Sequence, residues 1–156
     1  MAFPIEESHK LALAMGKFVD DPSRYRRLIG RLIYLTITRP ELCYTVHILS
    51  QFMQNPREEH MDAARRVLRY LKAIPGHGIL LPSDINLRVH AYCDAEWGAC
   101  PFTRRSFTGY LVTLDGSPVA WQTKKQTTAS RSLAKVEYRS MTATTSELIW
   151  LKTFLG

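Results

Sequence analysis

Along the first half of the chain, hydrophobic residues recur with the three- and four-residue spacing of amphipathic helices. The pattern predicts helices over residues 25–35, from Pro40 to Gln54, and over about 58–73. In the third helix, apolar and basic residues fall on different sides; the apolar set is Met61, Ala64, Val67, Leu68 and Leu71, and the basic set is Arg65, Arg66, Arg69 and Lys72. Residues 1–21 show no clear periodicity and read as an N-terminal strap, which ends where Asp21 and Pro22 can start a helix.

After the breaker run Pro75-Gly76-His77-Gly78 the hydrophobic period changes to two. Apolar and polar residues alternate over 87–94, a second strand is predicted over 107–114, and a third over 119–122. Asp115-Gly116 favours a tight hairpin between the last two. A long helix is predicted from Thr128 onward. The predicted fold is α/β: a small helical subdomain over 22–75, then three strands and a helix over 79–156.

The last helix carries an acid where the periodicity predicts burial. When the residues of this helix are placed at 100° steps around its axis, Glu137 lies inside an apolar sector about 80° wide. The other members of the sector are Leu133, Met141, Thr144, Leu148, Leu151 and Leu155. A buried carboxylate must be neutralised, paired or bound to a metal, because burying it unpaired costs several kcal/mol. Asp94 likewise ends an alternating strand. Simpler interpretations remain open: Glu137 is partly exposed and pairs with Arg131, Arg139 or Lys135 at the edge of the stripe, and Asp94 is a turn acid.

The net charge of the chain favours the binding of polyanions. The chain has 21 Lys and Arg against 14 Asp and Glu, a net charge of +7. Residues 104–139 hold most of the excess. We expect contact with a nucleic-acid backbone through Arg104, Arg105, Lys124, Lys125 and Arg131. A solvated basic surface without a ligand is the alternative.

Other classes receive no support from the sequence. The three cysteines have neither close pairing nor a histidine spacing typical of zinc sites, so neither a disulfide framework nor a zinc centre is predicted. The N-terminus lacks the basic start of a secretory signal, and no apolar run of about 18 residues occurs. We therefore expect an intracellular protein that does not contact a membrane.

Several motifs in order resemble the ribonuclease H domain of copia-type retrotransposon Pol polyproteins. They are Tyr92-Cys93-Asp94-Ala95-Glu96-Trp97-Gly98, Thr103-Arg104-Arg105-Ser106 with Thr108-Gly109-Tyr110, Trp121 with Lys124-Lys125-Gln126, Ser130-Arg131-Ser132, and Glu137-Tyr138-Arg139. Upstream segments, among them Tyr34-Leu35-Thr36-Ile37-Thr38-Arg39-Pro40 and Val67-Leu68-Arg69-Tyr70-Leu71-Lys72, resemble the end of the reverse-transcriptase region and its helical connection.

This resemblance implies a ribonuclease H-like fold in which four carboxylates hold two Mg²⁺ or Mn²⁺ ions and the RNA strand of an RNA:DNA hybrid is cleaved. Asp94 matches the family's first-strand aspartate, and Glu137 its first-helix glutamate. The other two family carboxylates lie beyond Gly156. Leu133 and Lys135 replace the usual Ser and Glu. We expect a catalytically incomplete fragment that at most binds nucleic acid and self-associates through an exposed sheet edge.

One short segment also matches a motif of a different class of protein. Arg66-Val67-Leu68-Arg69 spells the RxLR pattern of secreted effector proteins. Neither a signal peptide nor an acidic companion motif is evident, and such a tetrapeptide arises easily by chance in a basic amphipathic helix. A secreted effector or non-enzymatic interaction protein is the alternative function.

Overall fold

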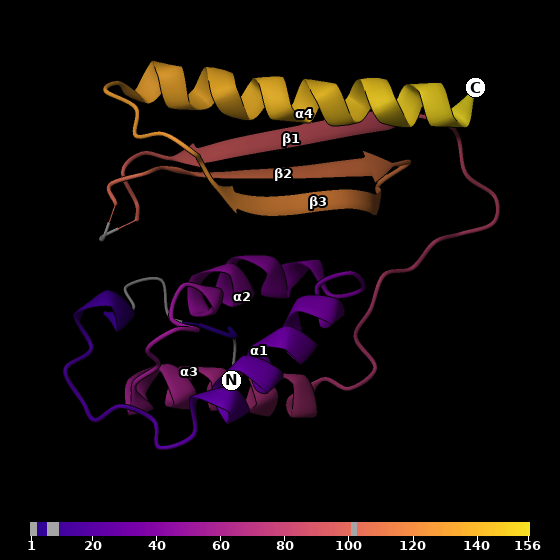
Figure 1. Cartoon of the computed structure of the whole chain (residues 1–156). Helices are drawn as coiled ribbons and strands as arrows, with labels where there is room; N and C mark the ends of the chain where they lie inside the picture. The colour runs from indigo at the N-terminus through magenta and orange to yellow at the C-terminus, as the bar shows by residue number, and fades with distance from the viewer. Residues whose placement is uncertain (1–2, 6–9, 101–102) are drawn as a thin grey trace. The chain divides into compact units, whose positions relative to one another are not determined.

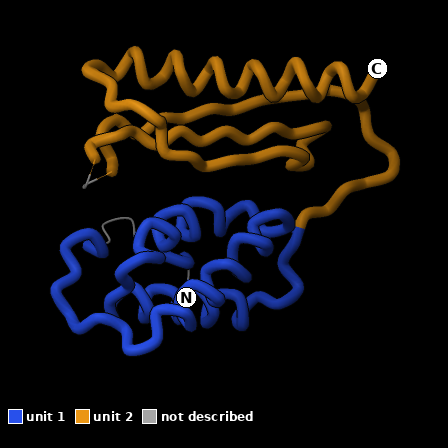
Figure 2. Tube along the Cα trace, in the orientation of Figure 1, with its two compact units in different colours: residues 1–78 blue, residues 79–156 orange. Residues whose placement is uncertain are grey.

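The computed structural model describes residues 3–5, 10–100 and 103–156. The chain forms two compact units, residues 1–78 and 79–156 (Figure 2). Unit 1 is helical, and unit 2 combines a sheet with one long helix (Figure 1). Within the described residues, no helix is both long and apolar enough to span a bilayer.

Helix α1, Pro22–Leu35, starts unit 1 where the sequence predicts a cap. The Asp21 carboxylate accepts hydrogen bonds from the backbone N–H groups of Ser23 and Arg24, at 2.9 and 3.2 Å. The face that α1 buries carries Tyr25, Ile29 and Leu32. Their spacing of four and three residues places them along one side of the helix, as the periodicity predicted.

Two further helices complete this core. The predicted helix from Pro40 to Gln54 is a 3-10 turn, Pro40–Leu42, followed by a shorter helix α2, Cys43–Ser50. Helix α3, Glu58–Ala73, buries Met61, Ala64 and Val67. The prediction that Leu68 belongs to the packed face is wrong, because it lies at the margin of the stripe and is 42% exposed.

The N-terminal strap is hydrogen-bonded to the start of α3. A short 3-10 turn, Leu11–Leu13, presents the Leu11 carbonyl 2.9 Å from His60 Nε2. Burial lowers the pKa of His60. The Glu59 carboxylate accepts a hydrogen bond from the Gly16 N–H at 2.6 Å. A Cβ at Gly16 would overlap the Glu59 carboxylate, which would have to move aside, so glycine permits this close approach. Residues 6–9 of the strap lie outside the described residues.

Unit 2 is a three-stranded antiparallel sheet in the order β1-β2-β3. The strands are β1, Val89–Glu96; β2, Phe107–Leu114; and β3, Ser117–Lys125. Asp115 and Gly116 form the β2–β3 turn with φ values of 49° and 86°, the left-handed conformation that tight hairpins require. Helix α4, Leu133–Leu155, covers one face of the sheet (Figure 1). The predicted α/β class, with three strands followed by a helix, is confirmed.

The packed face of α4 differs from the prediction. Its buried residues are Val136, Ser140, Thr144 and Leu151. Only Thr144 and Leu151 belong to the predicted sector, whereas Leu133 and Met141 are 49% and 52% exposed. Small hydroxyl side chains line the contact, and the Ser140 hydroxyl donates to the Asp94 carbonyl of β1 at 2.9 Å. Met141 and Leu148 of the sector lie on the β1 side of α4, where the described residues contribute no further strand.

Candidate metal and nucleic-acid sites

Asp94 and Glu137 lie on neighbouring elements of unit 2. Asp94 is in β1, opposite Gly109 of β2, and its backbone carbonyl accepts the Ser140 hydroxyl. Glu137 precedes Ser140 by three residues, about one helical turn. The hydrogen bond therefore fixes the first third of α4 above the strand segment that carries Asp94.

The strand register places the Asp94 side chain and helix α4, which carries Glu137, on different faces of the sheet. Tyr110 lies on the α4 face, where it is hydrogen-bonded to Glu147, and it is paired with Cys93. Since neighbouring strand residues alternate between faces, Asp94 projects from the other face. Glu137 lies about 160° around α4 from Arg139, which faces β3, so Glu137 is on the flank nearest β1.

Both carboxylates are exposed. The periodicity places Glu137 within an apolar stripe, but the structure leaves it exposed, on the flank of α4 where the described residues contribute no strand beyond β1. No ion pair within residues 3–5, 10–100 and 103–156 involves either acid. Arg139, one alternative partner of Glu137, instead donates to Ser130 Oγ at 2.8 Å. Over the same residues, no cluster of three or more His, Cys, Asp or Glu side chains could hold a metal ion.

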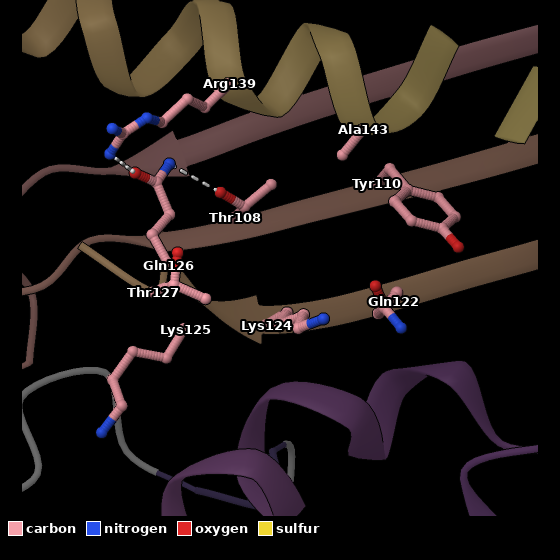
Figure 3. A pocket seen from close by; sticks show the side chains of 9 residues that line it. All are labelled: Thr108, Tyr110, Gln122, Lys124, Lys125, Gln126, Thr127, Arg139 and Ala143. Atoms are coloured by element: carbon pink, nitrogen blue, oxygen red, sulfur yellow. Dashed lines mark hydrogen bonds between the residues drawn. The ribbon is translucent and has the colours of Figure 1, made fainter. Parts of the chain in front are cut away.

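A basic pocket lies between α4 and strands β2 and β3 (Figure 3). Its lining residues are Thr108, Tyr110, Gln122, Lys124, Lys125, Gln126, Thr127, Arg139 and Ala143. Three are cations and none is an acid. Gln126 links the pocket walls, because its side-chain amide donates to Thr108 Oγ1 at 2.9 Å and its carbonyl oxygen accepts from Arg139 Nη1 at 3.4 Å. Burial, and secondarily Glu147, raises the pKa of Tyr110.

Of the five predicted nucleic-acid residues, Lys124 and Lys125 are among those that line this pocket. Lys124 and Arg139 line the pocket together, and Arg139 was not among the residues predicted to bind. Lys125 follows Lys124 in β3 and therefore leaves the opposite face, with its Nζ 3.8 Å from Cys100 Sγ; in Figure 3 it points away from Arg139. Arg104 and Arg105 lie in the β1–β2 connection and Arg131 before α4, outside the pocket.

Unit 2 thus combines an acid on β1, an acid on the following helix, and a separate basic pocket between α4 and strands β2 and β3. The chain is 44% identical over 152 residues to the retrovirus-related Pol polyprotein from transposon RE1 of Arabidopsis thaliana, covering 97% of this chain and 10% of the relative. It is 44% identical over 155 residues to the corresponding polyprotein of transposon RE2, covering 99% and 11%. The chain thus belongs to the copia-type retrotransposon Pol polyprotein family.

The match covers only part of these relatives, and other comparisons gave one further relative. The chain spans about a tenth of the length of these transposon polyproteins. It is also 38% identical over 128 residues to secreted RxLR effector protein 161 of Plasmopara viticola, covering 81% of this chain and 90% of the relative. No protein-family model and no solved structure matches the chain.

Proposed function

We propose that this chain is a Pol-derived, ribonuclease H-like fragment that binds RNA:DNA hybrid inside the cell and does not complete its cleavage. The observation that carries this proposal is the acid-free pocket in which Lys124 and Arg139 meet amide and hydroxyl groups. Such a set of donors suits phosphate oxygens, which accept charge-assisted hydrogen bonds without regard to base sequence. Family membership supports the hybrid as the polyanion.

Asp94 and Glu137 would be the carboxylate ligands of a divalent ion, and we expect them to hold it only weakly because the strand register places them on different faces of the sheet. Their carboxylate oxygens are the ligand type that Mg²⁺ and Mn²⁺ prefer. A bound ion would supply a polarised water for attack on phosphorus. Because no third acid joins them in the described part of the chain, we expect weak ion binding and no two-ion centre.

Binding of a fluorescently labelled RNA:DNA hybrid is expected to fall steeply with salt, with a log-log slope of roughly −0.7 to −0.9 per phosphate neutralised. Lys124→Ala should weaken binding and reduce that slope by about one such step. Lys152→Ala removes the same charge from an exposed position at the far end of α4 and should leave the slope unchanged. Equal slopes for both variants, or binding that ignores salt, would reject the pocket as the contact. Fluorescence anisotropy measures both quantities.

Incubating the labelled hybrid with Mg²⁺ or Mn²⁺ is expected to give no cleavage above a protein-free control, because among the described residues no third acid joins Asp94 and Glu137. Gel electrophoresis of the RNA strand gives the answer. Robust cleavage that disappears in Asp94→Asn would show that the two carboxylates suffice and would overturn the proposed inactivity. Cleavage that persists in Asp94→Asn would instead indicate a contaminating nuclease, and the purified Asp94→Asn protein serves as that control.

A secreted effector is the second candidate, favoured by the similarity to RxLR effector protein 161. The four-residue pattern lies inside α3, and Val67 within it is fully buried in the core of unit 1. A motif read by a receptor as an extended peptide would require this helix to unfold. A secretion assay with the intact N-terminus separates the two functions, since export would favour the effector.

A further inference from the structure

Arg139 of α4 is held through only one nitrogen of its guanidinium group. Within the described residues, all its hydrogen bonds run through Nη1, which donates to Ser130 Oγ at 2.8 Å, to Gln126 Oε1 at 3.4 Å and to the Thr128 carbonyl at 3.5 Å. These three acceptors belong to the connection between β3 and α4. The segment that leads into the helix therefore sets the orientation of this arginine.

The other edge of the same guanidinium group is unused. Nε and Nη2 of Arg139 make no hydrogen bond within residues 3–5, 10–100 and 103–156, and neither atom is buried. No ion pair in this part of the chain includes Arg139, and none of the residues that line the pocket is an acid. Two parallel N–H groups on one plane match two oxygens of a phosphate, a bidentate geometry that arginine forms and lysine does not.

Gln126 is itself fixed at three points. Its backbone N–H donates to the Ser106 carbonyl at 2.8 Å, and its side-chain Nε2 donates to Thr108 Oγ1 at 2.9 Å and to the Val136 carbonyl at 3.2 Å. Because a carbonyl can only accept, the amide nitrogen must face Val136, and the amide oxygen is left to face Arg139 (Figure 3). A rotated amide would place two oxygens together and an N–H group against a cation.

We propose that Arg139 is a bidentate phosphate ligand of the basic pocket and that Gln126 is its positioning residue. The β3–α4 connection holds Nη1, and Nε and Nη2 each donate to one oxygen of a single phosphodiester of the hybrid. Gln126 does not touch the phosphate; it restricts Arg139 before binding, so less conformational entropy is lost when the complex forms. This inference rests on the proposed function, because it names the phosphate contact within the same pocket.

Replacing Arg139 by lysine separates the paired hydrogen bonds from the charge. Arg139→Lys keeps the positive charge but offers no pair of parallel donors, so hybrid binding should weaken roughly tenfold while the salt slope stays at the wild-type value. Arg139→Ala removes both, so it should weaken binding further and reduce the slope by about one phosphate step. Fluorescence anisotropy over a range of salt concentrations measures affinity and slope. Wild-type affinity of Arg139→Lys would overturn the bidentate contact.

A double-mutant cycle tests whether Gln126 acts through Arg139. Gln126→Met keeps the length of the side chain and removes its hydrogen bonds, and it should weaken hybrid binding about three- to tenfold in the wild-type background. In the Arg139→Ala background the same change should have an effect of less than about twofold, because the group that it positions is gone. Equal effects in both backgrounds, or no effect in either, would show that Gln126 does not position Arg139.

Gln122→Met is the matched comparison for this cycle. Gln122 lines the same pocket but makes no hydrogen bond to Arg139 within the described residues. Whatever its size, the effect of Gln122→Met on hybrid binding should be the same in the wild-type and Arg139→Ala backgrounds to within about twofold. A coupling as large as that of Gln126→Met would reject a specific role for Gln126.

Nuclear magnetic resonance of the arginine side chains gives a readout in the unmodified protein. The Nε–H signal of Arg139 is identified by its absence from the spectrum of Arg139→Lys. Addition of the hybrid should shift this signal and slow its exchange with water, because the Nε–H group becomes hydrogen-bonded to phosphate. An unchanged signal at saturating hybrid would overturn the contact, even if Gln126→Met proved too unstable to measure.

Failure of this inference can be told apart from failure of the proposed function. A wild-type protein that does not bind the hybrid would reject both. If Lys124→Ala weakens binding as expected and Arg139→Lys equals the wild type, hybrid binding in the pocket stands and only the bidentate arginine contact is rejected.

Discussion

Tyr25→Ala is expected to lower the free energy of unfolding of unit 1 by roughly 3–5 kcal/mol. The Tyr25 ring is fully buried among the helices of the core, and its hydroxyl donates to the Leu49 carbonyl at 2.8 Å. Alanine would leave a cavity and an acceptor without its donor. Since small domains are stable by only about 5–15 kcal/mol, the loss is a large part of the total.

Two related variants separate the contributions at this position. Tyr25→Phe keeps the ring and removes the hydroxyl, so it should cost about 1–3 kcal/mol. Tyr34→Ala truncates the same residue type on the same helix, where the side chain is 77% exposed, and should change stability by about 0.5 kcal/mol or less. Urea unfolding followed by circular dichroism measures all three. Equal losses for Tyr25→Ala and Tyr34→Ala would contradict the assigned core.

Each unit can be followed separately because tryptophan is confined to one of them. Trp97, Trp121 and Trp150 all lie in residues 79–156. Tryptophan fluorescence therefore reports unit 2, and a loss of helical signal at unchanged fluorescence reports unit 1. A Tyr25→Ala protein that loses both signals together would show that the two units unfold as one.

Features set by local chemistry were predictable from the sequence. The Asp21 cap, the face of α1 and the hairpin turn at Asp115-Gly116 each depend on residues close together in the chain. Periodicity also separated the helical part from the strands. Boundaries were less well defined: the final helix begins at Leu133 rather than Thr128, where Ser132 provides the cap.

Features set by tertiary context were not predictable. Periodicity favours the side of α4 with the largest apolar residues, but the position of the sheet decides which side is buried. Ser140 and Thr144 are buried because their small side chains allow α4 to lie close to β1. The charge count likewise identified Lys124 and Lys125 without showing that they leave opposite faces of β3. Arg139 joins Lys124 only because α4, which packs over β1 and β2, directs the Arg139 side chain toward β3.

Val136→Asp is expected to destabilise unit 2 by roughly 3–5 kcal/mol, because it buries an uncompensated carboxylate. Val136 is fully buried on the packed side of α4, and its backbone carbonyl accepts a hydrogen bond from Gln126, one of the pocket residues, at 3.2 Å. Moving this turn of α4 away from the sheet would open the pocket that holds Lys124 and Arg139. Urea unfolding followed by tryptophan fluorescence should show the loss, and hybrid binding should fall with it.

Leu133→Asp distinguishes this packed face from the one that hydrophobic periodicity predicts. Leu133 is larger than Val136 and lies in the same part of α4, yet it is 49% exposed. An aspartate there remains hydrated, and its charge interacts favourably with the N-terminal end of the helix dipole, so stability should change by less than about 1 kcal/mol. Hybrid binding should weaken only slightly, through the added negative charge. If Leu133→Asp proved as damaging as Val136→Asp, α4 would be packed through the predicted sector, and the pocket between α4 and the sheet would lose its structural basis.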